Sequence, residues 1–350
     1  MSQNAGHTVS LKDPLPPKRK RKKRVPIALL IVLDIALAAL ILLVFYLTTY
    51  VWHGEIKPQP LTTPIAAAET PVLPSQDAET APTAPEQASA SAEPLTLREK
   101  FSDKFTDGSV ETTANSYKSA NISVSIDTAE KDGVTYFLAD IYVADIKYFK
   151  TAFAKEAAVL GHSEQTDEIA KEADAILAIN GDNCLDNMGL IIRNGSLYPM
   201  EDTDADLLIM YQDGTMVTLS PEDVDKDKII AEAPYQVWAF GPMLLQDGKS
   251  MTEFTSPQHI AGSPNNPRTA VGYYEPGHYC FLVVDGRQEG YSSPGMSCAQ
   301  MSELFYSLGC AAAYNLDGGQ TSEMAFMGEL YNQPFDGGRP VSDILYIADE

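Results

Sequence analysis

Two stretches decide the fold of this 350-residue chain: Tyr279-Cys-Phe-Leu-Val-Val-Asp-Gly-Arg287 and Ser297-Cys-Ala-Gln-Met-Ser-Glu-Leu-Phe-Tyr-Ser-Leu-Gly-Cys-Ala-Ala-Ala-Tyr-Asn-Leu-Asp-Gly-Gly319. The apolar runs 279–284 and 311–316 are too short for helices, which predicts two buried strands. A helix between them predicts a right-handed crossover that joins parallel strands. The carboxyl ends of the two strands would then lie at one edge of a sheet, with Asp285 and Asp317 facing one another across a crevice.

The helix between the two strands has clear end signals. Ser297 and Gln300 match a capping box, and Gly309 is a typical helix stop. Four apolar residues fall at helical spacing between these ends and predict one buried face: Met301, Leu304, Phe305 and Leu308.

Other segments repeat the pattern of a strand that ends in polar residues. Residues 134–143 are rich in β-branched and aromatic side chains and predict a strand. Residues 175–179 predict a buried strand that ends in Asn180-Gly181-Asp182. We therefore expect an α+β fold with a mixed sheet, a parallel crossover and few helices. Ligands of open sheets bind at strand carboxyl ends, although an Asp-Gly pair is also an ordinary turn sequence.

Arg268 lies in Asn265-Asn-Pro-Arg-Thr-Ala270, just ahead of the apolar residues that lead into the strand at 279–284. Its planar guanidinium suits a phosphate or a carboxylate ligand. In an acidic domain the same side chain also suits a structural ion pair, and the residues alone favour neither role.

The first hundred residues predict a membrane protein. Residues 18–24 are seven consecutive Lys or Arg residues, and a long apolar run follows. This pattern predicts a basic cytoplasmic tail (1–25) and an uncleaved transmembrane signal anchor (26–50), with the rest of the chain outside the cell. Residues 51–97 are rich in Pro, Ala and Thr and predict an extended extracellular stalk, which leaves 98–350 as the folded domain.

The charge balance argues against nucleic-acid binding. From Val25 onward the chain has 17 basic and 47 acidic residues, and such a body repels a polyanion.

The motifs together resemble the phosphodiester glycosidase family, which includes N-acetylglucosamine-1-phosphodiester alpha-N-acetylglucosaminidase and many bacterial surface proteins. The similarity extends from about Tyr136 to Ile347. It rests on seven blocks in the family's order: 178–182, 193–198, 240–244 with 247–249, 266–272, 283–287, 295–296 and 315–319.

The resemblance implies hydrolysis of a bond between a sugar's anomeric carbon and a phosphodiester in a surface or cell-wall glycopolymer. It implies catalytic roles for Asp317, Asp285 and Asp182, since such chemistry uses carboxyl groups. The implied substrate-binding residues are Arg268, Asn180, Arg287, Asn315, Gly318 and Gly319, with the amides of the two glycines helping Arg268 to hold the phosphate.

The chain departs from the family pattern at two places. Gln320 stands where a third Gly is usual, and Asn183-Cys184 replaces a frequent aromatic pair. A catalytically silent module that binds sugar phosphates or surface polysaccharides is therefore an alternative, and a stalked structural protein without a ligand is a third reading.

Metal and disulfide use are left open by the sequence. No cofactor is required by the predicted chemistry, and a structural calcium ion is an open alternative in so acidic a domain, although residues 201–206 lack the glycine of an EF-hand loop. The four cysteines suit either disulfides or free buried thiols. Cys298 and Cys310 cannot pair with each other if the helix between them forms.

Overall fold

The structure is a computed structural model that describes residues 26–47, 54–62, 95–187, 189–200, 203–254, 265–287 and 293–350. The chain divides into two compact units, residues 1–53 and 54–350. In the first unit, α1 (Ile27–Tyr46) contains a 19-residue apolar segment, Ala28–Tyr46, with a mean hydropathy of 3.1. This helix is long and apolar enough to cross a membrane. The expected basic tail and residues 48–53 lie outside the described residues.

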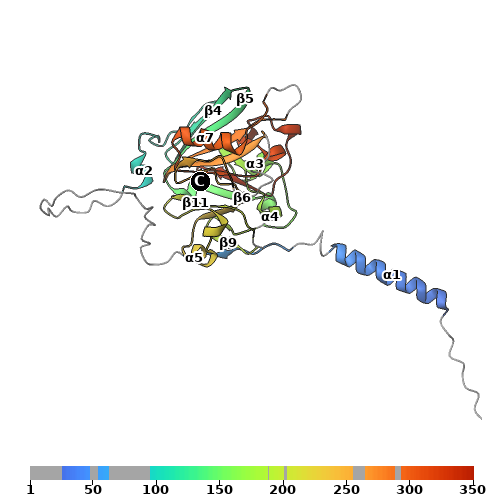
Figure 1. Ribbon diagram of the computed structural model, residues 1–350. Coiled ribbons are helices and arrows are strands. Elements are labelled where there is room, and N and C mark those ends of the chain that lie inside the picture. Colours follow the sequence, from blue (N-terminus) through green and yellow to red (C-terminus); the bar gives the residue numbers. More distant parts are fainter. Residues whose placement is uncertain are drawn as a thin grey trace, which may run out of the picture. The chain divides into compact units, whose positions relative to one another are not determined.

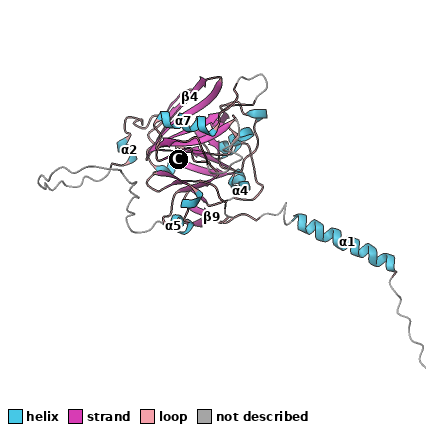
Figure 2. Ribbon diagram, in the orientation of Figure 1, coloured by secondary structure: helices cyan, strands magenta, loops and turns pink. Residues whose placement is uncertain are grey.

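Strands dominate the second unit (Figure 2). A seven-stranded sheet has the order β17-β15-β16-β5-β4-β3-β2, and all of its neighbours are antiparallel. Its strands are β2 (Glu111–Thr112), β3 (Ser116–Lys118), β4 (Ile122–Lys131), β5 (Val134–Val143), β15 (Arg268–Glu275), β16 (His278–Val284) and β17 (Ala312–Asn315).

A five-stranded sheet, also antiparallel, has the order β19-β18-β7-β20-β6. Its strands are β6 (Phe149–Phe153), β7 (Leu177–Asn180), β18 (Met324–Phe326), β19 (Glu329–Leu330) and β20 (Asp343–Ile347). A six-stranded sheet has the order β1-β9-β8-β12-β10-β11. It contains β1 (Gln59–Pro60), β8 (Ile191–Arg193), β9 (Ser196–Tyr198), β10 (Leu207–Met210), β11 (Met216–Leu219) and β12 (Gln236–Ala239), and β13 (Leu245–Gln246) and β14 (Lys249–Ser250) form a separate hairpin.

The described helices of this unit are short. They are α2 (Leu97–Lys100), α3 (Thr166–Glu172), α4 (Cys184–Asn187), α5 (Lys226–Ala231) and α7 (Cys298–Leu308). The end signals of α7 act as predicted, because Ser297 and Gln300 form the capping box and Gly309 adopts a left-handed conformation with φ 81°. Local sequence therefore specified this helix and the strand β5.

The predicted parallel crossover is wrong. The chain does run from β16 through α7 to β17, but β15 lies between the two strands and pairs with each of them in the antiparallel sense. Two antiparallel steps leave β16 and β17 running in the same direction, so their carboxyl ends still lie at one edge of the sheet. The third strand of the argument, β7, belongs to the five-stranded sheet.

One core joins the three sheets. It contains Ile126 and Tyr314 from the seven-stranded sheet, Leu345 from the five-stranded sheet and Trp238 from the six-stranded sheet. Helix α7 covers the opposite face of the seven-stranded sheet (Figure 1). Met301 and Phe305 of its predicted apolar stripe are buried there, and Leu304 and Leu308 are partly buried against the same cluster of β15, β16 and β17 side chains. All four cysteines lie among the described residues, where they are buried and form no disulfide: Cys184, Cys280, Cys298 and Cys310.

The beginning of the predicted stalk belongs to the folded domain. Strand β1 pairs with β9, and the amide groups of Ile56 and Leu61 donate to the carbonyl groups of Ala158 and Gly195 at 2.7 and 3.0 Å. Proline suits this edge position, where its missing N–H is not needed by a further strand. The stalk prediction is therefore wrong for residues 54–62, and its central part, residues 63–94, lies outside the described residues.

Candidate functional site

Asn180 ties the ends of strands from two sheets together. Its side-chain amide donates from Nδ2 to the carbonyl oxygen of Asp317 at 2.8 Å, and its Oδ1 accepts from Thr269 Oγ1 at 2.6 Å and from the Glu323 amide at 3.2 Å. Thr269 lies on β15 and Asp317 follows β17, whereas Asn180 ends β7. This fully buried side chain holds the turn in place, a role that differs from the predicted contact with substrate.

Asp317 lies beside a positive charge and near solvent. Its Oδ2 forms an ion pair with the Arg339 guanidinium at 3.0 Å, and its Oδ1 accepts from the Gly318 amide at 2.9 Å. The side chains of Asp317 and Arg339 are 14% and 43% exposed. Burial raises the pKa of Asp317, while Arg339 and the hydrogen bonds oppose that rise.

Asp285 is more enclosed. Its two carboxylate oxygens accept from Asn332 Nδ2 at 2.8 Å and from the Gln333 amide at 3.2 Å, and the residue is 1% exposed. Burial raises the pKa of Asp285, and the two hydrogen bonds oppose that rise. These contacts fix the 332–333 segment to the end of β16.

The two carboxylates share an edge with one strand between them. In the register of β15, Arg268 lies opposite Val284, and Ala270 lies opposite Asn315. Two strand spacings put the backbones of Asp285 and Asp317 roughly 10 Å apart. The order of strands thus confirms that the two turns are on one edge, with Pro267 and Arg268 between them.

Two further arginines lie at this edge, Arg268 at the start of β15 and Arg287 just after β16. Arg268 is buried, and its Nε donates to the Met296 carbonyl oxygen at 3.0 Å. Burial, chiefly, lowers the pKa of Arg268, and the nearby charge of Arg287 lowers it further. Arg287 donates from Nε to Asn266 Oδ1 at 2.8 Å.

Asp182 lies in a different environment. Its Oδ1 pairs with the Arg193 guanidinium at 2.6 Å, and the same guanidinium lies 3.3 Å from Asp343 Oδ2. Asp182 Oδ2 accepts from the Ala239 amide at 3.0 Å. All three charged side chains are at most 1% exposed. This burial favours a structural role for Asp182 in place of the predicted catalytic one.

Asp182, Cys184 and Asp343 could in principle hold a metal ion, because their ligand atoms lie within 4.8 Å of one another. The Arg193 guanidinium already contacts both carboxylates and supplies the cation that this group of acids requires. Burial and the neighbouring Asp182 raise the pKa of Asp343. The cluster is therefore better described as a buried ion-pair network than as a metal centre.

The other predicted binding groups are engaged within the protein. The Gly318 amide donates to its neighbouring carboxylate, as described above, and the Gly319 amide donates to the Pro267 carbonyl oxygen at 2.9 Å. Asn315 is fully buried and donates from Nδ2 to the Gly241 carbonyl oxygen at 2.8 Å. These contacts shape the edge, so the guanidinium groups are the stronger candidates for holding an anion.

Comparison with known proteins identifies the family of the domain that contains this edge. The family model described as phosphodiester glycosidase matches residues 169–348, which contain all of the residues discussed above. The chain belongs to the phosphodiester glycosidase family.

Two relatives define how far the family likeness extends. The SPbeta prophage-derived uncharacterized protein YomE of Bacillus subtilis (strain 168) is 34% identical over 189 residues, which are 51% of this chain and 29% of YomE, so the match spans less than a third of that relative. The catalytic domain of zebrafish N-acetylglucosamine-1-phosphodiester alpha-N-acetylglucosaminidase, in a form auto-inhibited by its pro-peptide, has a TM-score of 0.53 and 20% identity. That match covers 71% of this chain and 86% of the zebrafish domain, and it shows a shared fold.

Sequence reasoning missed several partners within this phosphodiester glycosidase domain. Arg339, Asn332, Arg193 and Asp343 were not singled out, because each meets its partner through the fold. One signal was present for Arg339: it follows Gly337-Gly338, just as Arg287 follows Asp285-Gly286. An arginine directly after a glycine turn thus occurs twice at this edge.

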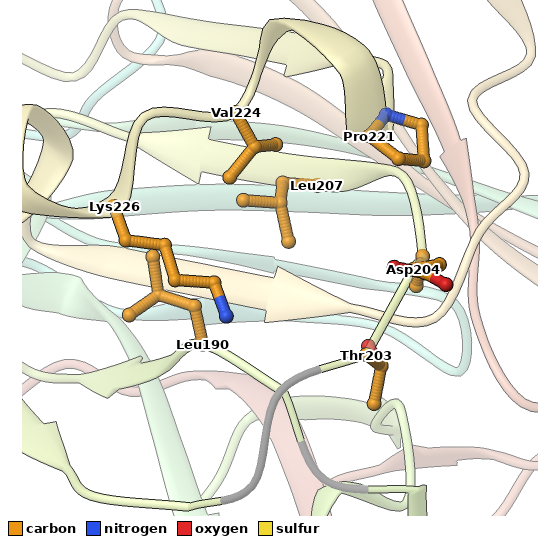
Figure 3. Close-up of a pocket in the computed structure, with 8 residues that line it drawn as sticks. Leu190, Thr203, Asp204, Leu207, Pro221, Val224 and Lys226 are labelled. Carbon is orange, nitrogen blue, oxygen red and sulfur yellow. The ribbon is translucent and has the colours of Figure 1, made fainter.

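A cavity of about 240 Å³ lies elsewhere in the domain, beside the start of β10 and of α5 (Figure 3). Its lining includes Leu190, Thr203, Leu207, Val224 and Lys226. None of the predicted site residues contributes to this lining, so we do not connect the cavity with the edge formed by Asp285 and Asp317.

Proposed function

We propose that this domain hydrolyses the bond between a sugar's anomeric carbon and a phosphodiester group. The observation that carries the proposal is the charge arrangement at the edge around Asp317. A partly exposed carboxylate pairs there with Arg339, Arg268 begins the adjacent strand β15, and Arg287 Nη1 lies 3.4 Å from the position of a Cβ added at Gly319. In a body with a large excess of acidic residues, such a group of arginines suits a phosphate.

The geometry suits Asp317 for the carboxylate that faces the anomeric carbon. Arg339 favours its ionised form, which can stabilise an oxocarbenium-like transition state or attack the carbon. The carbon–oxygen bond breaks and its electron pair leaves with the oxygen of the released phosphate monoester. Water supplies the hydroxyl of the released sugar, and its remaining proton goes to the phosphate monoester or to solvent. Asp285 positions the segment that contains Asn332 and Gln333, since it is only 1% exposed and both of its oxygens accept hydrogen bonds from that segment.

The membrane position forms a second part of the proposal. The apolar helix α1 follows the basic run 18–24, a charge asymmetry that favours a cytoplasmic N-terminus and an extracellular domain. A surface or cell-wall glycopolymer is then the accessible substrate. Protease added to intact cells should remove the domain while leaving residues 1–25 protected, whereas a mature form that begins beyond Trp52 would contradict the anchor.

Turnover tests the enzymatic part of the proposal. The full-length protein in detergent should release free sugar from a sugar-1-phosphodiester, and the Asp317→Asn variant should release it far more slowly. We also propose that no metal is required, so activity should persist in EDTA. A structural calcium ion away from the edge would show instead as a calcium-dependent rise of the melting temperature.

A binding module without turnover is the second candidate, favoured by the departure from the family pattern at Gln320. This module would bind a sugar-1-phosphodiester in an equilibrium titration and release no sugar. Binding of the sugar-1-phosphodiester with no release of sugar during a long incubation would favour this function over hydrolysis.

A further inference from the structure

Arg339 is the most exposed partner of the candidate catalytic carboxylate. Within the part of the chain that the structure describes, its side chain makes one hydrogen bond, from a terminal nitrogen to Asp317 Oδ2. A guanidinium has five N–H donors in a planar fork. With 43% of the Arg339 side chain exposed, donors remain toward solvent beside the carboxylate.

Gln320 and Glu323 hold the short loop that carries Arg339. Gln320 donates from Nε2 to the Gly338 carbonyl oxygen at 3.0 Å. The Glu323 carboxylate lies against Gly338, because a Cβ added at that glycine would lie 1.8 Å from Glu323 Oε1. Gly338 also has a φ of 88°, a backbone conformation that side chains disfavour. The backbone immediately before Arg339 is thus fixed from two sides.

This arrangement explains a departure of the chain from its family pattern. The family resemblance implies a glycine where Gln320 stands, and a glycine would have no side chain to make the contact with Gly338. The residue that looked like a defect in the binding motif therefore supports a charged side chain at the edge of the site.

We infer that Arg339 is a specificity-determining residue that contacts the anionic oxygen of the phosphodiester, and that Gln320 positions it. The inference rests on the proposed function and deepens it. In the free protein Arg339 pairs with Asp317, and in the complex its outward donors reach the anion as well. A sugar with a neutral leaving group has no oxyanion for this contact, so Arg339 selects for phosphorylated substrates.

Steady-state kinetics of full-length variants test both roles. Arg339→Gln should raise KM for a sugar-1-phosphodiester by about ten- to a hundredfold, the value of a charge-assisted contact, with a smaller change in kcat. Gln320→Ala should raise KM less. Because Gln320 acts through Arg339, adding Gln320→Ala to Arg339→Gln should cause no further rise. Arg98 lies on α2 and donates to Asn121 Oδ1, so Arg98→Gln removes a comparable arginine contact away from the edge; it is the matched control and should leave KM unchanged.

A binding measurement separates this inference from the proposed function. A phosphorus NMR titration with dimethyl phosphate, an anionic diester without a sugar, should show binding to the parent and a corresponding loss in Arg339→Gln. If the parent hydrolyses no phosphodiester but binds dimethyl phosphate, and Arg339→Gln loses that binding, the proposed function fails and the anion contact stands. Equal KM and equal binding in Arg339→Gln and the parent would overturn the inference. Independent, additive effects of the two substitutions would overturn the positioning role of Gln320.

Discussion

The domain contains two carboxylate–arginine groups that look alike in sequence and differ in surroundings. Asp182 follows a buried strand and pairs with Arg193 where at most 1% of either side chain is exposed. Asp317 also follows a buried strand, but its pair with Arg339 is partly open to solvent. Removing one partner of a fully buried pair leaves a charge without solvent, whereas an open pair can exchange its partner for a ligand. Exposure, not residue type, thus separates the buried group from the group that we propose is functional.

Asp317→Asn tests the partly exposed pair of Asp317 and Arg339. The variant should lose about 10²- to 10⁴-fold in hydrolysis rate, because the amide can neither stabilise a positive carbon nor attack it. Its melting temperature should stay close to that of the parent, since the shape and most hydrogen bonds are preserved. Asp182→Asn is the sharpest control, and we expect it to lower the melting temperature. Equal hydrolysis rates in Asp317→Asn and the parent would remove Asp317 from the chemistry.

Arg193→Met tests the buried group of Asp182, Arg193 and Asp343. The substitution leaves Asp182 and Asp343 buried together without their cation, at a cost of about 3–5 kcal/mol in the free energy of unfolding. Urea unfolding followed by tryptophan fluorescence measures the change, since Trp238 packs against Arg193. A variant as stable as the parent would show that the network does not support the fold.

Gly181→Ala tests how tightly the buried group of Asp182, Arg193 and Asp343 is packed. An added Cβ would lie 2.2 Å from Asp343 Oδ2, so the carboxylate that contacts Arg193 must shift. We expect a loss of about 3 kcal/mol in the free energy of unfolding, typical of an overpacked core. Gly54→Ala is the matched control, since an added Cβ there meets no atom within 4 Å. Equal losses in both variants would mean that the contact with Asp343 plays no part.

The elements that sequence predicted well are those whose signals are local. Ser297, Gln300 and Gly309 lie within a few residues of the helix ends that they specify, and α7 formed between them. The insertion of β15 between β16 and β17 depends on pairing between distant residues, which no local pattern reveals. The motif around Gly272 was recognised, but its place in the sheet was not.

The same limit applies to the candidate site. The edge with Asp285 and Asp317 followed from chain order, since both strands run in one direction. The distinction between Asp182 and Asp317 depends on which arginine folds against each carboxylate. Arg193 is 11 residues from Asp182 along the chain and Arg339 is 22 residues from Asp317, and neither separation has a regular period. Burial, which decides their roles, is a property of the whole fold.

Glu323→Gln gives the smallest expected effect. It tests the buried carboxyl group of Glu323, which lies against Gly338. Burial raises the pKa of Glu323 from its ordinary value of 4.5 to about 7. The protonated form therefore stabilises the fold fully below pH 4.5, and this contribution is lost as pH rises through 7. Because glutamine does not ionise, the variant should gain on the order of 2 kcal/mol relative to the parent between pH 4.5 and pH 8. Urea unfolding at both pH values measures this gain, with Glu329→Gln on the exposed strand β19 as the control.

Part of the parent's pH dependence should persist in the variant, since the pKa of Asp343 is raised in the same direction. Identical pH dependence in Glu323→Gln and the parent would show that Glu323 ionises as freely in the folded protein as in the unfolded chain.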